Sequence, residues 1–385
     1  MGAGATGMWE VNAQGDTVPA WGSASYDFGC VVTPGNYLHF VAVLNAFSDI
    51  RNPENRVNGV YDVRADLEGN VTYTLIRAEE GGTFVWADAG VDRQGNIYAI
   101  WVALPENEEA PGEIWASKST NNGSSWSQPV RIANDLDRTH HYPHITYHIG
   151  QYFYVLYEKP NPETGLYDHF VVKMASSMEG QPVLMETGAS SAVFFSYYVG
   201  SVNAIDQDWN NGVVYFAVRS ADGRGVTVGY STGDNWELQS ISGAQRYPGV
   251  ALDQGGDDGT PWVFSNFGLP PAGAYHKNWY SYDELGYGGG SWMDPIPLDS
   301  ILWNGVRELL YCHQGVWTSE GRLVSGCNIW GQFTPEGFEV NFSDDGGANW
   351  AGMNILYNIF DVGLRGGFIA QNILLAGENN HLFVA

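Results

Sequence analysis

Short runs in which apolar and polar residues alternate dominate this chain, and Gly, Asn, Asp and Pro interrupt them. No segment sustains an apolar repeat of about 3.6 residues, the period of an amphipathic helix. Successive side chains of a strand point to opposite faces, so alternation predicts strands, and the interruptions predict turns. The pattern therefore predicts an all-β protein.

One unit recurs along the chain: a strand ends in a polar turn containing Gly or Asn, and a very hydrophobic strand follows. Its seven copies lie at residues 31–40, 90–101, 145–155, 204–216, 251–264, 316–324 and 375–383. The copies are roughly 50–60 residues apart, which is the repeat length of four-stranded propeller blades. A second hairpin, such as residues 113–118 with 125–132, follows the first one in the repeat and supplies the two outer strands of the blade.

The two ends of the chain complement each other in this scheme. The last hairpin supplies only two strands before the chain stops at Ala385, and residues 8–11 and 17–21 precede the first inner strand. We expect these N-terminal residues to provide the missing outer strands, because a closed ring leaves no exposed sheet edge. The expected fold is one β-propeller domain over residues 1–385, closed by both termini, with seven four-stranded blades, or six if one weak copy is no blade.

Two segments share the template S-x-[N/D]-x-G-x-x-W, at residues 119–126 and 343–350, and a shortened copy lies at 231–236. The Asn or Asp can accept backbone N–H bonds, the Gly allows a positive φ, and the Trp buries a large surface. The template resembles the Asp-box, or BNR repeat, of sialidase-like propellers. The resemblance implies this architecture and a structural role for the motif, without identifying a catalytic site.

Charge narrows the expected partners. The chain has 43 acidic and 17 basic residues, a net charge of −26. Such a surface repels nucleic acid and anionic membranes, and it suits a protein kept soluble outside the cell. No apolar stretch is long enough to span a bilayer, and no signal peptide is visible at the N-terminus. We expect an extracellular or cell-surface protein whose signal has been removed, or one exported by another route.

Cysteine usage leaves the compartment open. Cys312 and Cys327 flank a turn at residues 319–321 at similar distances. Either they form a cross-strand disulfide, which requires an oxidising compartment, or they are two buried free thiols. The acidic loop at residues 253–258 is a candidate site for a structural Ca²⁺ ion, and no other cofactor is expected.

Propellers bind ligands at one mouth of the central channel, which is lined by the segments that lead into the innermost strands. Four of these segments carry an arginine: Arg138, Arg246, Arg307 and Arg365. Converging guanidinium groups would bind a carboxylate or sulfate through paired hydrogen bonds, which favours an acidic sugar. The alternative is that each arginine pairs with a nearby acidic residue such as Asp137.

The segment before the third inner strand is rich in further candidates. Aligning the repeats places His141-Tyr142-Pro143 on Arg246-Tyr247-Pro248, so His141 and Arg246 should occupy equivalent positions. A His beside Tyr and Arg suits general acid–base chemistry, with Tyr142 and Tyr247 contacting substrate. The alternative is a solvated loop. His144 and His148 lie in the strand itself and are expected to be structural.

Two further residues complete the candidate catalytic set. Tyr198 precedes the fourth inner strand and would act as nucleophile or acid, and Glu158 ends the second strand of the third blade as a candidate acid. Aromatic residues such as Trp86 are candidates for stacking on sugar rings. True sialidases carry an Arg-Ile-Pro motif that this chain lacks, whereas seven-bladed polysaccharide lyases are similar in using His, Tyr and Arg on uronates.

Two functions follow from the sequence. The first is an extracellular propeller that binds or cleaves an acidic glycan at the channel mouth, and an enzyme of this kind would be a glycoside hydrolase or polysaccharide lyase. The alternative is a non-catalytic surface, adhesion or assembly module with a protein partner. Neither involves nucleic acid or membrane insertion.

Overall fold

The computed structural model describes residues 8–11, 17–21, 28–44, 57–139, 142–191, 204–243, 245–254, 259–267, 277–298, 309–318, 321–330, 335–356, 374–376 and 382–384. Throughout these ranges the chain forms strands and turns, and no helix occurs in them. The all-β prediction is confirmed.

The first half of the chain forms three sheets, each an antiparallel meander running outward from its first strand. The first sheet contains β3 (Phe28–Thr33), β4 (Tyr37–Leu44), β5 (Gly59–Ala65) and β6 (Val71–Ala78). The second contains β7 (Gly82–Asp92), β8 (Ile97–Pro105), β9 (Gly112–Ser119) and β10 (Val130–Leu136). The third contains β11 (His144–Ile145), β13 (Tyr152–Asn161), β14 (Leu166–Ala175) and β15 (Val183–Ser191). A fifth strand of the second sheet, β12 (His148–Ile149), pairs in parallel with β7.

The second half repeats this arrangement three times. The fourth sheet contains β16 (Ile205–Gln207), β17 (Val214–Arg219), β18 (Gly225–Ser231) and β19 (Glu237–Ser242). The fifth contains β20 (Gln245–Leu252), β21 (Pro261–Phe267), β22 (Lys277–Tyr282) and β23 (Ile296–Pro297). The sixth contains β24 (Leu309–Trp317), β25 (Leu323–Trp330), β26 (Pro335–Ser343) and β27 (Ala351–Leu356). Two pairs remain near the termini: β1 (Met8–Val11) with β2 (Thr17–Trp21), and β28 (Leu374–Ala376) with β29 (Leu382–Val384).

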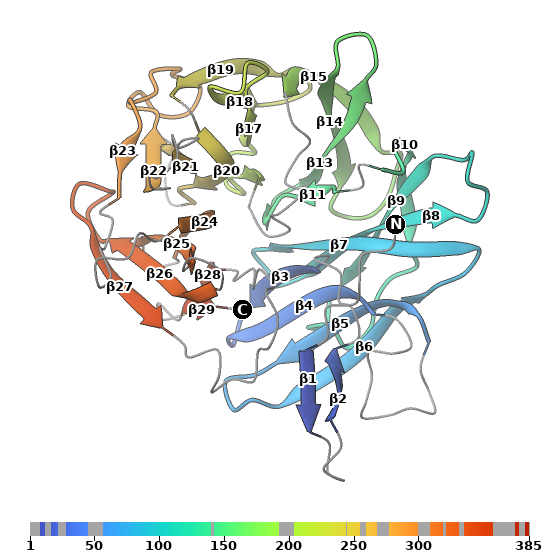
Figure 1. Cartoon of the computed structure of the whole chain (residues 1–385). Helices are drawn as coiled ribbons and strands as arrows, with labels where there is room; N and C mark the ends of the chain where they lie inside the picture. Colours follow the sequence, from blue (N-terminus) through green and yellow to red (C-terminus); the bar gives the residue numbers. More distant parts are fainter. Residues whose placement is uncertain are drawn as a thin grey trace.

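The sheets are arranged around a central axis (Figure 1). Their innermost strands contact one another in a closed sequence, β3 to β7, β11, β16, β20, β24, β28 and back to β3. The fold is therefore a β-propeller, as predicted. Strands β1 and β2 form where the sequence predicted them, but within the described ranges they pair only with each other. A count of seven blades and completion of the last one by β1 and β2 stay predictions.

The apolar core is divided among the interfaces between successive sheets. Val31 and Trp101, for example, belong to the cluster between the first and second sheets, and Tyr98 and Phe153 to the cluster between the second and third. Trp101 is 1% exposed and Tyr98 is fully buried. Large aromatic side chains fill the space between twisted sheets, which explains the abundance of Trp and Tyr.

The first S-x-[N/D]-x-G-x-x-W segment forms the turn between β9 and β10. The Ser119 hydroxyl accepts a hydrogen bond from the Gly123 N–H at 3.0 Å, and Asn121 Oδ1 accepts one from the Ser125 N–H at 2.9 Å. Gly123 has a φ of +76°. Trp126 packs on the cluster between the first and second sheets. The turn chemistry expected from the sequence is present.

The second segment forms the corresponding turn between β26 and β27. The Ser343 hydroxyl accepts the Gly347 N–H at 2.8 Å, and Asp345 Oδ1 accepts the Asn349 N–H at 2.8 Å. The Asn349 side chain, the Asn349 N–H and the Ser343 hydroxyl all bond this carboxylate, and they lower the pKa of Asp345 to about 2. Trp350 packs on the cluster between the fifth and sixth sheets.

Each of these turns is seated on the preceding sheet. A side chain on Gly123 would overlap the Asp62 carboxylate of the first sheet. That carboxylate lies 3.0 Å from Nδ1 of the fully buried His39, whose Nε2 is 2.9 Å from Asn122 Oδ1. A side chain on Gly347 would likewise overlap Trp262 of the fifth sheet. The motif therefore joins neighbouring sheets in addition to closing its own hairpin.

Candidate functional site

Three innermost strands lose their regular register near the end where the chain enters them. The shifts fall between Val85 and Ala87 in β7, between Arg246 and Gly249 in β20, and between 311 and 314 in β24. Because four antiparallel strands return the chain to the side where the sheet began, these ends share one face of the ring, which we call the channel face. Bulges re-aim side chains and are frequent beside functional sites.

Trp86 lies at the register shift of β7 and has a φ of +52°. A bulky residue in this region is strained and persists only where its surroundings hold it. Its indole N–H donates to the Pro143 carbonyl at 2.7 Å, and its ring lies edge-on to Tyr142 with centroids 4.9 Å apart. Trp86 is 1% exposed, so the expectation that it stacks on a sugar ring is wrong; it joins the second and third sheets.

Two histidine–aspartate pairs connect strands of neighbouring sheets. His144 Nδ1 lies 3.5 Å from the Asp88 carboxylate, which also accepts the Ile145 N–H at 3.1 Å. His148 Nδ1 lies 3.1 Å from Asp206. Both histidines are buried, as expected for structural residues. They tie β11 to β7 and β12 to β16.

The structure describes one of the four predicted arginine side chains. Arg138 donates from Nη1 to the carbonyls of Pro105 at 3.0 Å and Ala110 at 3.1 Å, and so closes the turn between β8 and β9. Arg246 is the second residue of β20, on the channel face, and its side chain lies outside what the structure describes. Two further arginines are outside the described residues: Arg307 and Arg365. Their convergence stays a prediction.

The strand pairing places the two Tyr-Pro segments at similar positions in their blades, each just before a residue of the innermost strand that pairs with the second strand. His144, which follows Tyr142-Pro143, pairs with Leu156, and Gly249, which follows Tyr247-Pro248, pairs with Phe264. Tyr142 is partly buried against Trp86, and for Tyr247 only the backbone is described. Two candidate catalytic residues fall outside the described residues: His141 and Tyr198.

Glu158 is 2% exposed and lies opposite His169 across the β13–β14 ladder. His169 Nε2 is 3.0 Å from the Ser191 hydroxyl, and burial lowers the pKa of His169 to about 3. This imidazole is therefore neutral at physiological pH. No sequence motif singles out His169, although the short turn between β13 and β14 places it opposite Glu158. An acid role for Glu158 stays a prediction.

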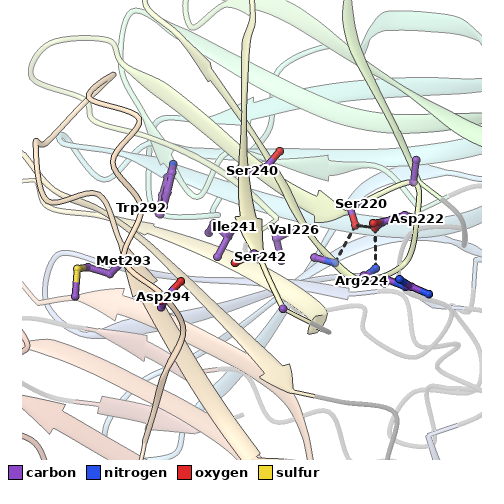
Figure 2. A pocket seen from close by; sticks show the side chains of 13 residues that line it. Ser220, Asp222, Arg224, Val226, Ser240, Ile241, Ser242, Trp292, Met293 and Asp294 are labelled. Atoms are coloured by element: carbon purple, nitrogen blue, oxygen red, sulfur yellow. Dashed lines mark hydrogen bonds between the residues drawn. The ribbon is translucent and has the colours of Figure 1, made fainter.

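A second feature is an open pocket of about 610 Å³ between the fourth and fifth sheets (Figure 2). Residues 220–226 and 240–243 of the fourth sheet line one side, and residues 292–294 ahead of β23 line the other. None of them belongs to an innermost strand. No sequence pattern indicates this pocket, because it forms between segments about 50 to 70 residues apart.

No group of three or more His, Cys, Asp or Glu side chains suited to a metal ion occurs among the described residues. Residues 255–258 of the acidic loop fall outside them, so a structural Ca²⁺ there stays an open prediction. Within the described ranges, no helix has the length and apolar character needed to cross a bilayer. The β24–β25 ladder brings Cys312 and Cys327 to a register shift on adjacent strands, and the side chains of both lie outside the description.

No protein-family model and no curated protein matches the sequence. Among solved structures, a Hadza microbial sialidase is 11% identical, with a TM-score of 0.43 over 90% of this chain and 60% of its own length. The Aleuria aurantia lectin in complex with Fucα1-6GlcNAc is 11% identical, with a TM-score of 0.47 over 86% of this chain and 95% of its own. The α-L-arabinofuranosidase of Fusarium graminearum is 12% identical, with a TM-score of 0.47 over 77% of this chain and 85% of its own length.

Likeness at this level transfers no activity or ligand, and this chain spans about 60% of the length of the Hadza sialidase. The architecture rests on the chain's own strands, ladders and ring of contacts. This chain is a β-propeller, and its two repeated turns at 119–126 and 343–350 carry its resemblance to the sialidase-like propellers.

Proposed function

We propose that this propeller binds an acidic glycan on its channel face. The observation that carries the proposal is the cluster of register shifts in β7, β20 and β24 on this one face. Such bulges re-aim side chains and are over-represented next to functional sites.

The acidic character of the ligand follows from the arginines. Arg246 stands at the start of β20, and the chain enters the next two innermost strands through segments that carry Arg307 and Arg365. A protein with a net charge of −26 repels anions over most of its surface, so an anionic ligand needs a local group of cations. Guanidinium groups bind carboxylates in a planar, paired geometry, which suits a uronate or sialoside. Arg138 contributes less, because its Nη1 already bonds backbone carbonyls.

Cleavage of the bound glycan would draw on His141 and Tyr198, with Glu158 as the acid. His141 lies beside Tyr142 in the segment before β11, and Tyr198 lies in the segment before β16. Both segments lead into the channel face. Such an enzyme would be a glycoside hydrolase or a polysaccharide lyase acting on acidic sugars. A glycan ligand also agrees with the proposed location outside the cell.

A non-catalytic assembly module is the second candidate, and the outer edge of the first sheet favours it. Val71, Tyr73 and Leu75 alternate along β6 and are 40%, 41% and 41% exposed. An uncovered apolar edge strand is a template for pairing with another chain. Light scattering over a concentration series would show association if this candidate were right.

A glycan array carrying sialosides, uronates and neutral glycans tests the principal proposal. We expect the protein to retain acidic glycans, and Arg246→Ala and His141→Ala to weaken that binding. Arg131→Ala is the control, because Arg131 pairs with Glu113 on the outer strands of the second sheet. If both channel-face variants retained acidic glycans as the wild type does, or if the wild type retained none, the proposal would be wrong.

A further inference from the structure

The open pocket between the fourth and fifth sheets has an apolar floor and an aromatic wall (Figure 2). Val226 and Ile241 form the floor and are buried. Trp292 and Asp294 stand on one side, and the turn that carries Asp222 stands on the other. A cavity of about 610 Å³ is within the size range of small-molecule sites, about 300–1,000 Å³.

The indole of Trp292 is held in place before any ligand binds. Its N–H donates to Gln239 Oε1 at 2.7 Å, and the ring lies edge-on to Tyr215 with centroids 6.5 Å apart. The loop ahead of it is fixed by the buried Asp283, which accepts the Ser291 N–H at 3.1 Å. Trp292 remains partly exposed on the pocket side. A pre-organised aromatic surface contacts a ligand without losing side-chain entropy on binding.

Polar groups surround this apolar surface. Hydroxyls come from Ser240 and Ser242 of β19, and the exposed carboxylates of Asp222 and Asp294 lie on opposite sides. Arg224 is the one cation among the lining residues. Bonds from the Ser220 hydroxyl and the Arg224 N–H hold the pKa of Asp222 below its usual value, so Asp222 stays ionised. The lining holds two carboxylates and one guanidinium, so its net charge is negative.

We propose that this pocket is a second carbohydrate site and that it binds neutral saccharides. A sugar ring has an apolar C–H face that fits Trp292 and the floor, and hydroxyls that donate to Asp222 and Asp294. The same carboxylates repel a uronate or sialoside. The two sites therefore select ligands of opposite character, an acidic glycan on the channel face and a neutral one between the sheets.

Lactose and 3′-sialyllactose form a matched pair of probes, because they differ by one anionic sugar. In titrations followed by tryptophan fluorescence and ligand NMR, we expect lactose, maltose or cellobiose to bind. We expect sialyllactose to reach the pocket about tenfold more weakly or worse at low salt. Trp292→Ala should abolish neutral binding. Trp115→Ala is its control, because Trp115 lies on β9 with its N–H bonded to Glu113.

Charge variants examine the selectivity separately. Asp294→Asn should narrow the difference between lactose and sialyllactose, whereas Glu163→Gln in the exposed β13–β14 turn should leave it unchanged. Neutral binding that survives Trp292→Ala, or sialyllactose binding that depends on Trp292 and equals that of lactose, would overturn the inference. So would binding of trilysine with no saccharide bound, which would make the pocket a site for cationic peptide. The channel-face proposal fails separately, through Arg246→Ala and acidic glycans.

Discussion

Replacing Gly123 with alanine tests whether the repeated turn is seated on the neighbouring sheet. Gly123 has a φ of +76°, and an added methyl group would overlap the Asp62 carboxylate and lie 3.0 Å from His39 Cε1. Both partners are buried and bonded to each other, so neither can move aside without breaking a contact. The substitution should therefore lower stability through backbone strain and through steric overlap.

A matched glycine separates the two contributions. Gly165, in the β13–β14 turn, has a φ of +70° and no atom within 4 Å of an added methyl group. Gly165→Ala should cost about 1–2 kcal/mol, the penalty of a left-handed conformation for an L-residue. Overpacking adds about 1–3 kcal/mol at a buried site. Gly123→Ala should therefore cost about 2–5 kcal/mol.

Urea unfolding of the two variants and the wild type, with the slope against denaturant compared for all three, measures these differences. We expect the midpoint of Gly123→Ala to fall well below that of Gly165→Ala at similar slope. A difference between the two variants of less than about 0.5 kcal/mol, the usual range of surface substitutions, would refute the docking of this turn on His39 and Asp62.

Three further predictions concern two buried histidines and a pair of cysteines. The pKa of His169 is lowered to about 3, so between pH 3 and 6.5 the unfolded chain binds more protons than the folded one, and the free energy of unfolding falls as pH falls. Urea unfolding at pH 7.5 and pH 5 should show that His169→Gln loses about 2 kcal/mol less stability over this interval than the wild type. An unchanged pH profile would contradict this. His39→Leu leaves the buried Asp62 carboxylate without its histidine partner and should lower the free energy of unfolding by about 3–5 kcal/mol. In a double-mutant cycle, Asp62→Asn should restore part of this loss, and no restoration would argue against the pair. Mass spectrometry of protein digested without reductant should yield a peptide linked through Cys312 and Cys327 if the fold forms in an oxidising compartment, and free thiols on both would exclude the bridge.

The hairpins were predictable because their signals are local. The structure contains a paired hairpin at each of the seven repeats, from β3–β4 at the first to β28–β29 at the last. The alternating pattern sets which face is buried, and Gly, Asn or Asp marks the turn. The bonding inside the turns at 119–126 and 343–350 was predictable for the same reason.

Contacts between sheets were not predictable, because they depend on how distant segments meet. The repeat at residues 145–155 reads as a simple hairpin in the sequence, but its turn also contains β12, which pairs in parallel with β7 of the preceding sheet. Trp86 carries a polar N–H and a large ring, and it is buried because the third sheet packs against it and the Pro143 carbonyl accepts its N–H. The pocket beside Trp292 needs two sheets, and no periodicity within either one reveals it.

The decisive experiment is a crystal structure of the protein bound to an acidic oligosaccharide. We expect the ligand to lie on the channel face, beside the starts of β7, β11 and β20, with its carboxylate paired to the Arg246 guanidinium. An acidic ligand seated in the pocket beside Trp292, or bound on the outer strands with Arg246 free of it, would show that the channel face is not the site for acidic glycans.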